Sequence, residues 1–151
     1  MRFSLIILFL ACAIATANAA DSGKIAKVLP FYLDLKGRNA LSPSLFDRDA
    51  YQAQLREHQT NVSAIRFDIL WKASAVRNSQ LKLRAELRGV DANGFPCRAL
   101  LETNIAPHLF SRWTSLTLRG EDFKNFGSLV AWKITLSKGD ELLAEQKSFL
   151  W

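Results

Sequence analysis

Hydrophobic and polar residues alternate with a period of two along most of the chain. This period is typical of strands buried on one face, because successive side chains of a strand point to opposite faces of a sheet. It is clearest at residues 81–89, where every odd position up to Leu87 is apolar and charged residues occupy the even positions. In all, seven strands are expected, at residues 29–35, 62–72, 81–89, 97–105, 111–119, 129–137 and 142–150.

The apolar positions of these strands predict the core. The inward residues expected on the four clearest strands are Leu29, Phe31, Leu33 and Leu35; Ile65, Phe67, Ile69 and Trp71; Leu81, Leu83, Ala85 and Leu87; and Val130, Trp132, Ile134 and Leu136. Trp71 and Trp132 lie in register with aliphatic neighbours, so both rings are expected inside.

Turn-forming residues separate the strands. The segment Asp91-Ala92-Asn93-Gly94 contains an Asn-Gly pair, which favours the positive φ angles of a tight hairpin. Lys138-Gly139-Asp140 is expected to close a second hairpin. A short helical turn is also expected at residues 121–125.

One segment, residues 39–60, lacks the alternation and reads as a connection with a short helix near residues 47–58. Asp47 is expected at the N-cap, with Phe46 and Tyr51 forming a hydrophobic staple around it. Tyr51 and Leu55 are four residues apart, so they share one narrow apolar face that can rest on the strands.

Seven strands with turns at this spacing predict an all-β domain, a single antiparallel β-sandwich. The pattern resembles an immunoglobulin-like or fibronectin type III-like sandwich. The Cys…Trp…Cys signature of immunoglobulin domains is absent, because one cysteine remains after residue 19. Phe123 and Phe126 stand where a tyrosine corner would be sought, so the strand topology stays open.

The N-terminus has the three parts of a cleavable signal peptide: Arg2, an apolar run over residues 3–14, and the small-x-small site Ala17-Asn18-Ala19. Cleavage before Ala20 is expected, leaving residues 20–151 as one exported domain, periplasmic or extracellular. The apolar run is too short for a membrane anchor, which needs about 20 apolar residues. A lipoprotein processed at Cys12 is the rival interpretation.

The charge and the cysteine content limit the classes of partner and of covalent chemistry that are expected. The formal net charge is +6, and loss of Arg2 with the signal peptide leaves +5. The basic residues are dispersed rather than gathered into a stripe, which argues against nucleic-acid binding. Later segments are too short to span a membrane, so no stable membrane insertion is expected. Cys97 is left without an internal disulfide partner, as either a small buried residue or a reactive or intermolecularly bonded thiol.

The sequence contains no recognisable catalytic motif. His58 and His108 are fifty residues apart in the sequence without further ligands at metal-binding spacing, so no metal and no cofactor are expected. Asp47-x-Asp49 and Asp91-x-Asn93 are better explained by capping and turn formation than by calcium. A Cys97–His108 dyad is a weak possibility. The chain is therefore expected not to be an enzyme.

A binding surface is the remaining class of site. On residues 111–119, Thr114, Leu116 and Leu118 are expected to face inward, which places a tryptophan among hydroxyls and a cation on the outer face. The candidate contact residues there are Trp113, Ser115, Thr117 and Arg119. Lys82, Arg84 and Arg88 line the outer face of another strand and would favour an acidic glycan or an anionic protein; whether the two strands share a sheet stays open. The alternative is that a helix or loop covers Trp113.

The expected function is thus an exported binding or accessory module for a protein or glycan partner. A second hypothesis is an assembly subunit that joins neighbours through its terminal strands. It rests on the apolar end Phe149-Leu150-Trp151, which suggests either a last strand buried to its tip or a sticky edge that allows self-association.

Overall fold

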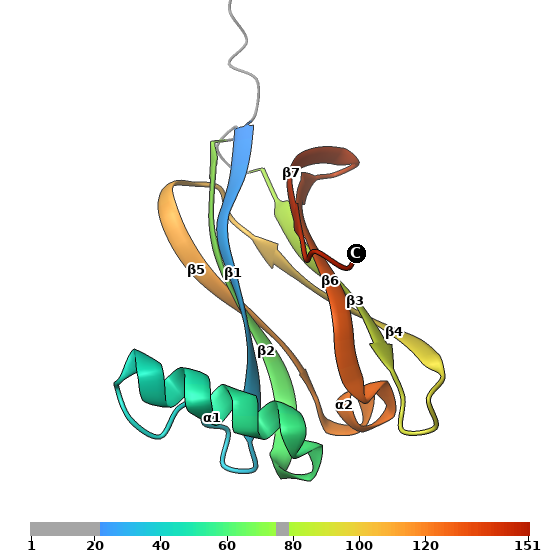
Figure 1. The fold of residues 1–151 in the computed structure, drawn as a ribbon. Coiled ribbons are helices and arrows are strands. Elements are labelled where there is room, and N and C mark those ends of the chain that lie inside the picture. Colours follow the sequence, from blue (N-terminus) through green and yellow to red (C-terminus); the bar gives the residue numbers. More distant parts are fainter. Residues whose placement is uncertain (1–21, 75–78) are drawn as a thin grey trace, which may run out of the picture.

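The computed structural model describes residues 22–74 and 79–151, so the expected signal peptide lies outside the described residues. These residues form two antiparallel sheets packed as a sandwich, with a helix at one end of each sheet (Figure 1). The elements are β1 (Ser22–Asp34), α1 (Leu45–Glu57), the 3-10 turn η1 (Gln59–Asn61), β2 (Val62–Ser74), β3 (Leu81–Val90), β4 (Pro96–Ile105), β5 (His108–Arg119), α2 (Gly120–Phe126), β6 (Ser128–Lys138) and β7 (Glu141–Lys147).

The strand order is β1-β2-β5 in one sheet and β4-β3-β6-β7 in the other, which confirms the seven-stranded antiparallel sandwich. In constant-type immunoglobulin domains the fourth strand joins the sheet of the first, second and fifth. Here β4 pairs with β3 in the other sheet, so the strand order differs from that of constant-type immunoglobulin domains. Neither described helix has the length and apolar character needed to cross a membrane.

The core lies between the two sheets, and the alternation predicts most of it. On β2 and β3 all eight expected inward residues are buried to 2% exposure or less. The Trp71 ring is fully enclosed and its indole N–H donates to Thr114 Oγ1 at 2.9 Å. Helix α2 closes one end, where Phe123 and Phe126 pack into the same core rather than forming a tyrosine corner.

The predicted register of β1 is wrong, and the predicted inward facing on β6 fails at one position, Val130; a bulge lies near each. A bulge between Ile25 and Lys27 shifts β1, so Val28 and Tyr32 enter the core. The expected residues Phe31 and Leu33 are buried on the opposite face, and Leu35 is exposed beyond the strand.

On β6 the irregularity lies opposite Arg88 and Gly89. It leaves Val130 47% exposed and buries Ala131. Ile134 and Leu136 are buried as expected, whereas Trp132 is only partly buried and meets Phe67 edge-on, with ring centroids 6.4 Å apart.

Helix α1 begins three residues earlier than expected. Ser44 is the N-cap and accepts the Asp47 N–H, so Asp47 is the third helical residue and not the cap. Phe46 lies inside the helix and is 82% exposed, so the expected staple does not form. The Tyr51–Leu55 face is confirmed: Leu55 is buried in the core and Tyr51 packs against it.

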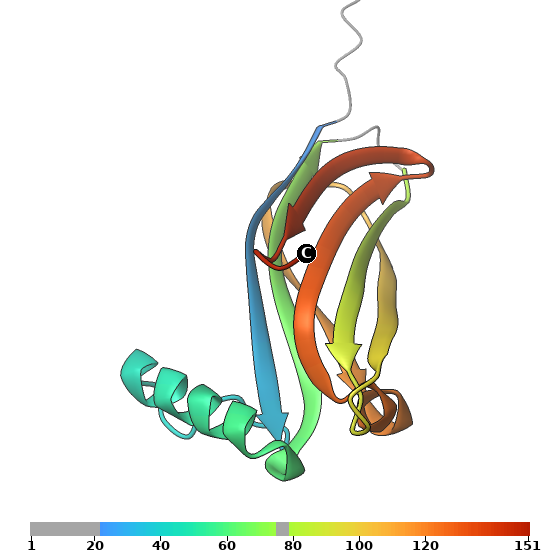
Figure 2. The same cartoon turned by 45° about the vertical axis from the view of Figure 1, so that its right-hand side comes forward.

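The same helix covers the free edge of β1. The buried Gln52 side chain accepts the Tyr32 N–H at 2.8 Å and donates to the Tyr32 carbonyl at 2.9 Å. It therefore makes the two bonds that a neighbouring strand would make. Farther along, β1 and β7 lie side by side across the two layers (Figure 2), and a Cβ at Gly23 would meet Leu143 Cβ at 2.8 Å.

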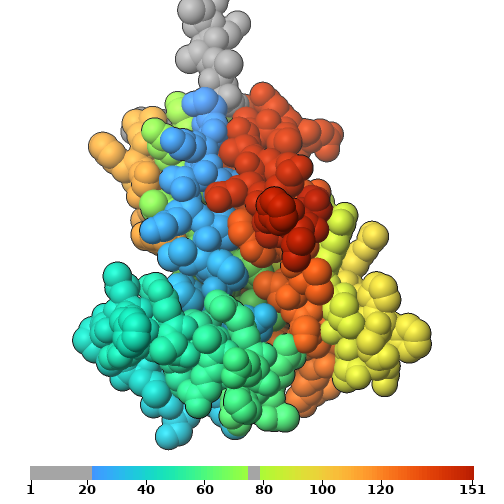
Figure 3. Space-filling model, viewed as in Figure 1, coloured from blue at the N-terminus to red at the C-terminus, as the bar shows by residue number. Residues whose placement is uncertain are grey.

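The C-terminal segment is not a strand buried to its tip, as one expectation had it. Strand β7 ends at Lys147, and Phe149 is fully exposed. Trp151 instead lies over the outer face of the four-stranded sheet, against Arg88 and Lys133. The dark red C-terminal residues are visible on the molecular surface in Figure 3.

Candidate functional site

The two groups of expected contact residues lie on opposite sides of the molecule. Trp113, Ser115, Thr117 and Arg119 belong to β5 in the three-stranded sheet, and Lys82, Arg84 and Arg88 belong to β3 in the four-stranded sheet. Because the outer faces of a sandwich point in opposite directions, these residues form two separate surfaces rather than one.

The first surface contains Trp113, which neither a helix nor a loop of the described chain covers: the residue is 53% exposed. The expected facing of β5 is confirmed, since Leu116 and Leu118 are buried on the inner face. On the outer face Ser115 donates to Asp68 Oδ1 at 2.7 Å, which ties the middle of β5 to β2.

Two further apolar residues of the same strand are exposed, and we call Leu109, Phe110 and Trp113 the β5 patch. Leu109 is 74% exposed and Phe110 is 77% exposed. Neither residue was predicted from the sequence, because the strand was expected to begin at residue 111. The signal was present in two adjacent apolar residues that no turn or helix pattern explained.

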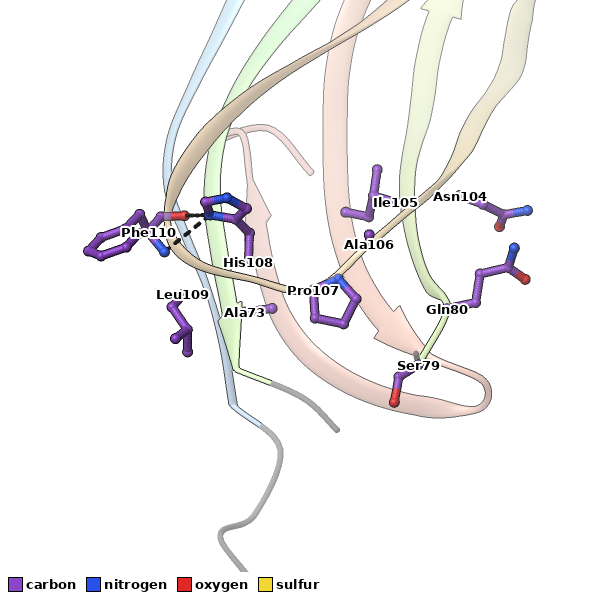
Figure 4. Close-up of a pocket in the computed structure, with 10 residues that line it drawn as sticks. All are labelled: Ala73, Ser79, Gln80, Asn104, Ile105, Ala106, Pro107, His108, Leu109 and Phe110. Carbon is purple, nitrogen blue, oxygen red and sulfur yellow. Dashed lines mark hydrogen bonds between the residues drawn. The ribbon is translucent and has the colours of Figure 1, made fainter. Parts of the chain in front are cut away.

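A local irregularity makes the patch protrude. Trp71 pairs with Arg112 and Ala73 pairs with His108, so β5 has two more residues than β2 between these pairs. The His108 ring holds this segment, since its Nδ1 accepts the Phe110 N–H at 3.3 Å. In Figure 4 the Phe110 ring points outward from β5. The patch also lies on an edge strand, because β5 has β2 as its one strand neighbour in the described sheets.

Beside the patch, the open end of the sandwich contains a groove of about 1040 Å³ (Figure 4). Its walls include Gln80, Asn104, Ile105, Pro107 and His108. The polar groups are mainly amides. Among the described residues that line the groove, His108 is the one titratable side chain.

The second surface is more neutral than the sequence implies. Lys82 and Arg84 both pair with Glu102 of β4, at 3.5 and 3.2 Å. Arg88 differs, because its direct neighbour on β4 is Arg98 and Trp151 lies against it. Arg98 and Trp151 were not predicted as neighbours of Arg88. The sequence predicted a hairpin here, but it did not predict the register of that hairpin or the path of the C-terminal segment.

The Cys97–His108 dyad, which the sequence offered only as a weak alternative, is not formed. Cys97 is at the beginning of β4 and His108 follows its end, so a rise of about 3.3 Å per residue separates them by roughly 30 Å. The half-buried Cys97 thiol donates to the Phe126 carbonyl at 2.8 Å. Burial and the charge of Asp91 raise the Cys97 pKa, which disfavours the nucleophilic thiolate.

Other ionisable groups serve local structure. The described residues contain no group of three His, Cys, Asp or Glu side chains placed to hold a metal ion. Asp91 accepts the Asn93 and Phe95 N–H groups, as a turn residue does. Asp49 pairs with Arg48 on the surface of α1.

The most perturbed carboxyl group belongs to Asp34, which is 5% exposed at the end of β1. Burial alone would raise its pKa, but hydrogen bonds from the Arg38 and Lys36 N–H groups, the Tyr51 hydroxyl and the Arg38 side chain lower that pKa to about 2. Because every oxygen lone pair is directed at the turn or at α1, we assign Asp34 a structural role.

No family model matches the chain, and comparisons with curated proteins and with solved structures find no significant match either. Its function is therefore argued from its own residues.

Proposed function

We propose that the protein is an exported, non-enzymatic binding module that uses the β5 patch to contact a protein partner. The observation that carries the proposal is the exposure of three large apolar side chains within five residues of an edge strand. Contiguous exposed apolar surface on a soluble domain is typical of interaction sites. Aromatic residues are also the commonest energetic anchors of protein interfaces.

Charges around the patch favour an acidic partner. Lys72 is exposed on the outer face of β2, two residues along from Leu70, the partner of Trp113, and within the described residues it is not paired with an acid. The carboxylate of the same face, Asp68, is engaged by Arg66 and Ser115. The complementary surface is therefore an apolar contact bordered by Asp or Glu side chains.

The geometry favours β5 over the terminal strands as the contact site. Gln52 occupies the edge of β1 at Tyr32, and β1 and β7 lie against each other. The terminal strands therefore offer less free edge than β5. Assembly through the C-terminal segment remains the second candidate, because Phe149 and Leu150 are exposed there.

A site-specific crosslinking experiment tests the proposal. A photoreactive phenylalanine analogue replaces Phe110 in the producing cells, and a second strain carries it at Phe95, which is 66% exposed in the β3–β4 turn. We expect a discrete protein adduct from position 110 and none from position 95. The loss of the hot-spot aromatic in Trp113→Ala should weaken binding at least about 30-fold and remove the adduct.

Phe149→Ala provides the matched control, because it removes an exposed aromatic residue from the other candidate surface. The adduct should persist in this variant and fade as salt is raised, since exposed charges are screened within about 10 Å at 0.1 M salt. Loss of the adduct in Phe149→Ala with retention in Trp113→Ala would favour the terminal assembly surface instead. Absence of an adduct at position 110 would refute the proposal.

A further inference from the structure

The outer face of the four-stranded sheet has a pair of like charges without a local counterion. Arg88 of β3 and Arg98 of β4 are directly opposite each other, and both are exposed. Directly opposed like charges on neighbouring strands are destabilising. The acids nearby are engaged by other cations: Glu86 pairs with Lys133 at 3.0 Å, and Glu102 pairs with Lys82 and Arg84. Among the described residues no carboxylate pairs with Arg88 or Arg98.

Trp151 holds one of these arginines in place. The Arg88 guanidinium carbon is 3.9 Å from the centroid of the Trp151 ring, and Lys133 Nζ is 4.9 Å from it. The chain before the ring is fixed to β6, because the Ser148 N–H donates to the Trp132 carbonyl at 2.9 Å and the Trp132 N–H donates to Ser148 Oγ at 3.0 Å. A stacked guanidinium keeps its edge N–H donors available for an anion.

A cavity lies beside this arginine pair. Its volume is about 360 Å³, and its lining includes Arg84, Arg88, Arg98, Leu100 and Trp151. Glu86 also lines it, with its carboxylate paired to Lys133. That volume is within the usual range of small-ligand sites, about 300–1000 Å³. Leu100 is 54% exposed, so it gives the cavity an apolar wall next to the cationic one.

We propose that this cavity binds an acidic oligosaccharide through the carboxylate of a uronic acid residue. Arg88 and Arg98 present planar donor groups that match a carboxylate, and bidentate contacts of this kind are strong. Leu100 and the Trp151 ring offer apolar surface to the C–H groups of the sugar. Inorganic phosphate alone would leave this apolar surface uncovered. The site is on the face opposite the β5 patch, so it stands or falls independently of the proposed protein contact.

Calorimetric titration of the purified protein tests the site with tetragalacturonate as the probe. Maltotetraose serves as the neutral sugar, and inorganic phosphate and a tetraglutamate peptide serve as non-sugar anions. We expect saturable binding of tetragalacturonate alone, weakened by salt. Arg98→Gln should reduce the affinity about tenfold or more, the usual effect of losing a charge-assisted hydrogen bond. Arg88→Lys keeps the charge but loses the planar fork, and should reduce it similarly.

Arg56→Gln is the matched control, because it removes one exposed positive charge from α1, beside the other sheet. Its affinity for tetragalacturonate should stay within about twofold of the parent. Equal losses of affinity in Arg56→Gln and Arg98→Gln would show that net charge alone accounts for the effect, and would overturn the proposed site. Binding of phosphate or the peptide at comparable affinity, or no binding of tetragalacturonate, would also overturn it. All three substituted residues are exposed, and a thermal melt of each variant confirms that the fold is intact.

Discussion

Replacement of Asp34 by Asn should cost stability in a pH-dependent way. In the folded chain the Asp34 carboxylate receives four hydrogen bonds of 2.8 Å: two from backbone N–H groups at Lys36 and Arg38, one from Arg38 Nε and one from the Tyr51 hydroxyl. An asparagine side chain would keep one acceptor oxygen and turn an NH2 group toward the remaining donors. The variant thus leaves buried donors unsatisfied.

The magnitude follows from the pKa of the group. The folded-state pKa of Asp34 is about 2, against an ordinary value of 3.8. One pKa unit corresponds to about 1.36 kcal/mol, so ionised Asp34 contributes roughly 2 kcal/mol to folding. Its side chain is 8% exposed, so solvent screening does not reduce this figure much. Since the folded pKa is the lower one, the contribution is present above about pH 4 and lost as the pH falls from 4 to 2.

Urea denaturation followed by tryptophan fluorescence between pH 2 and 7 measures this difference. The free energy of unfolding of Asp34→Asn should be about 2 kcal/mol or more below that of the parent at pH 7, and the gap should narrow below pH 4. Asp140→Asn, in the exposed β6–β7 turn, should show a small gap at every pH. A gap for Asp34→Asn that stays constant down to pH 2 would refute the assigned hydrogen-bond network.

Three further predictions test the core, a turn and the expected processing. Trp71→Ala should lower the free energy of unfolding by about 3–5 kcal/mol, whereas Lys82→Ala should change it by less than about 0.5 kcal/mol; chemical denaturation compares them. Gly127 has φ +68° and a Cβ there would collide with the Val90 carbonyl, so Gly127→Ala should cost more than about 1 kcal/mol, seen as a lower melting temperature. Intact-mass analysis of the native protein should give a chain that begins at Ala20; a full-length or Cys12-lipidated species would contradict the expected cleavage.

The sequence predicts the fold well where one physical constraint dominates. On β3 each inward position is apolar and each outward position up to Arg88 is charged, so a shift of one residue would bury charge. The Asn93-Gly94 turn then sets the pairing of β3 with β4, with Gly94 at φ +85°. The seven strands and their division into a sandwich follow from repeated constraints of this kind.

The register of strand β1 could not be predicted from alternation, because both of its faces are apolar. Its outer face is buried under α1, where Arg48 lies 5.5 Å from the Phe31 ring centroid, and from the β2 side Arg66 lies 5.9 Å from it. Alternation predicts a register only when one face is polar. The alternate positions that include Phe31 and those that include Tyr32 are similarly apolar in the sequence. The bulge near Lys27 determines which of the two sets faces the core.

The candidate sites were predicted in part for a related reason. Trp113 could be placed outward because its own strand alternates. The other residues of the two sites are brought into place by tertiary structure. The extra residues of β5 expose Phe110, and the C-terminal segment brings Trp151 to Arg88. Neither feature can be recognised from the local sequence, because both depend on contacts between segments that are distant in the sequence.

The distribution of edge protection links the fold to the proposed contact. An exposed edge strand is a liability that natural proteins usually cover or charge. This chain covers the edge of β1 with the amide of Gln52 and with the contact between Gly23 and Leu143. On β4 it places charged side chains at Arg98 and Glu102. β5 carries Arg112 and Arg119, but Leu109 and Phe110 near its start leave apolar side chains exposed on this edge strand. The exposed apolar side chains of this edge are what the proposed partner would cover, because the same exposure in a free monomer would favour aggregation.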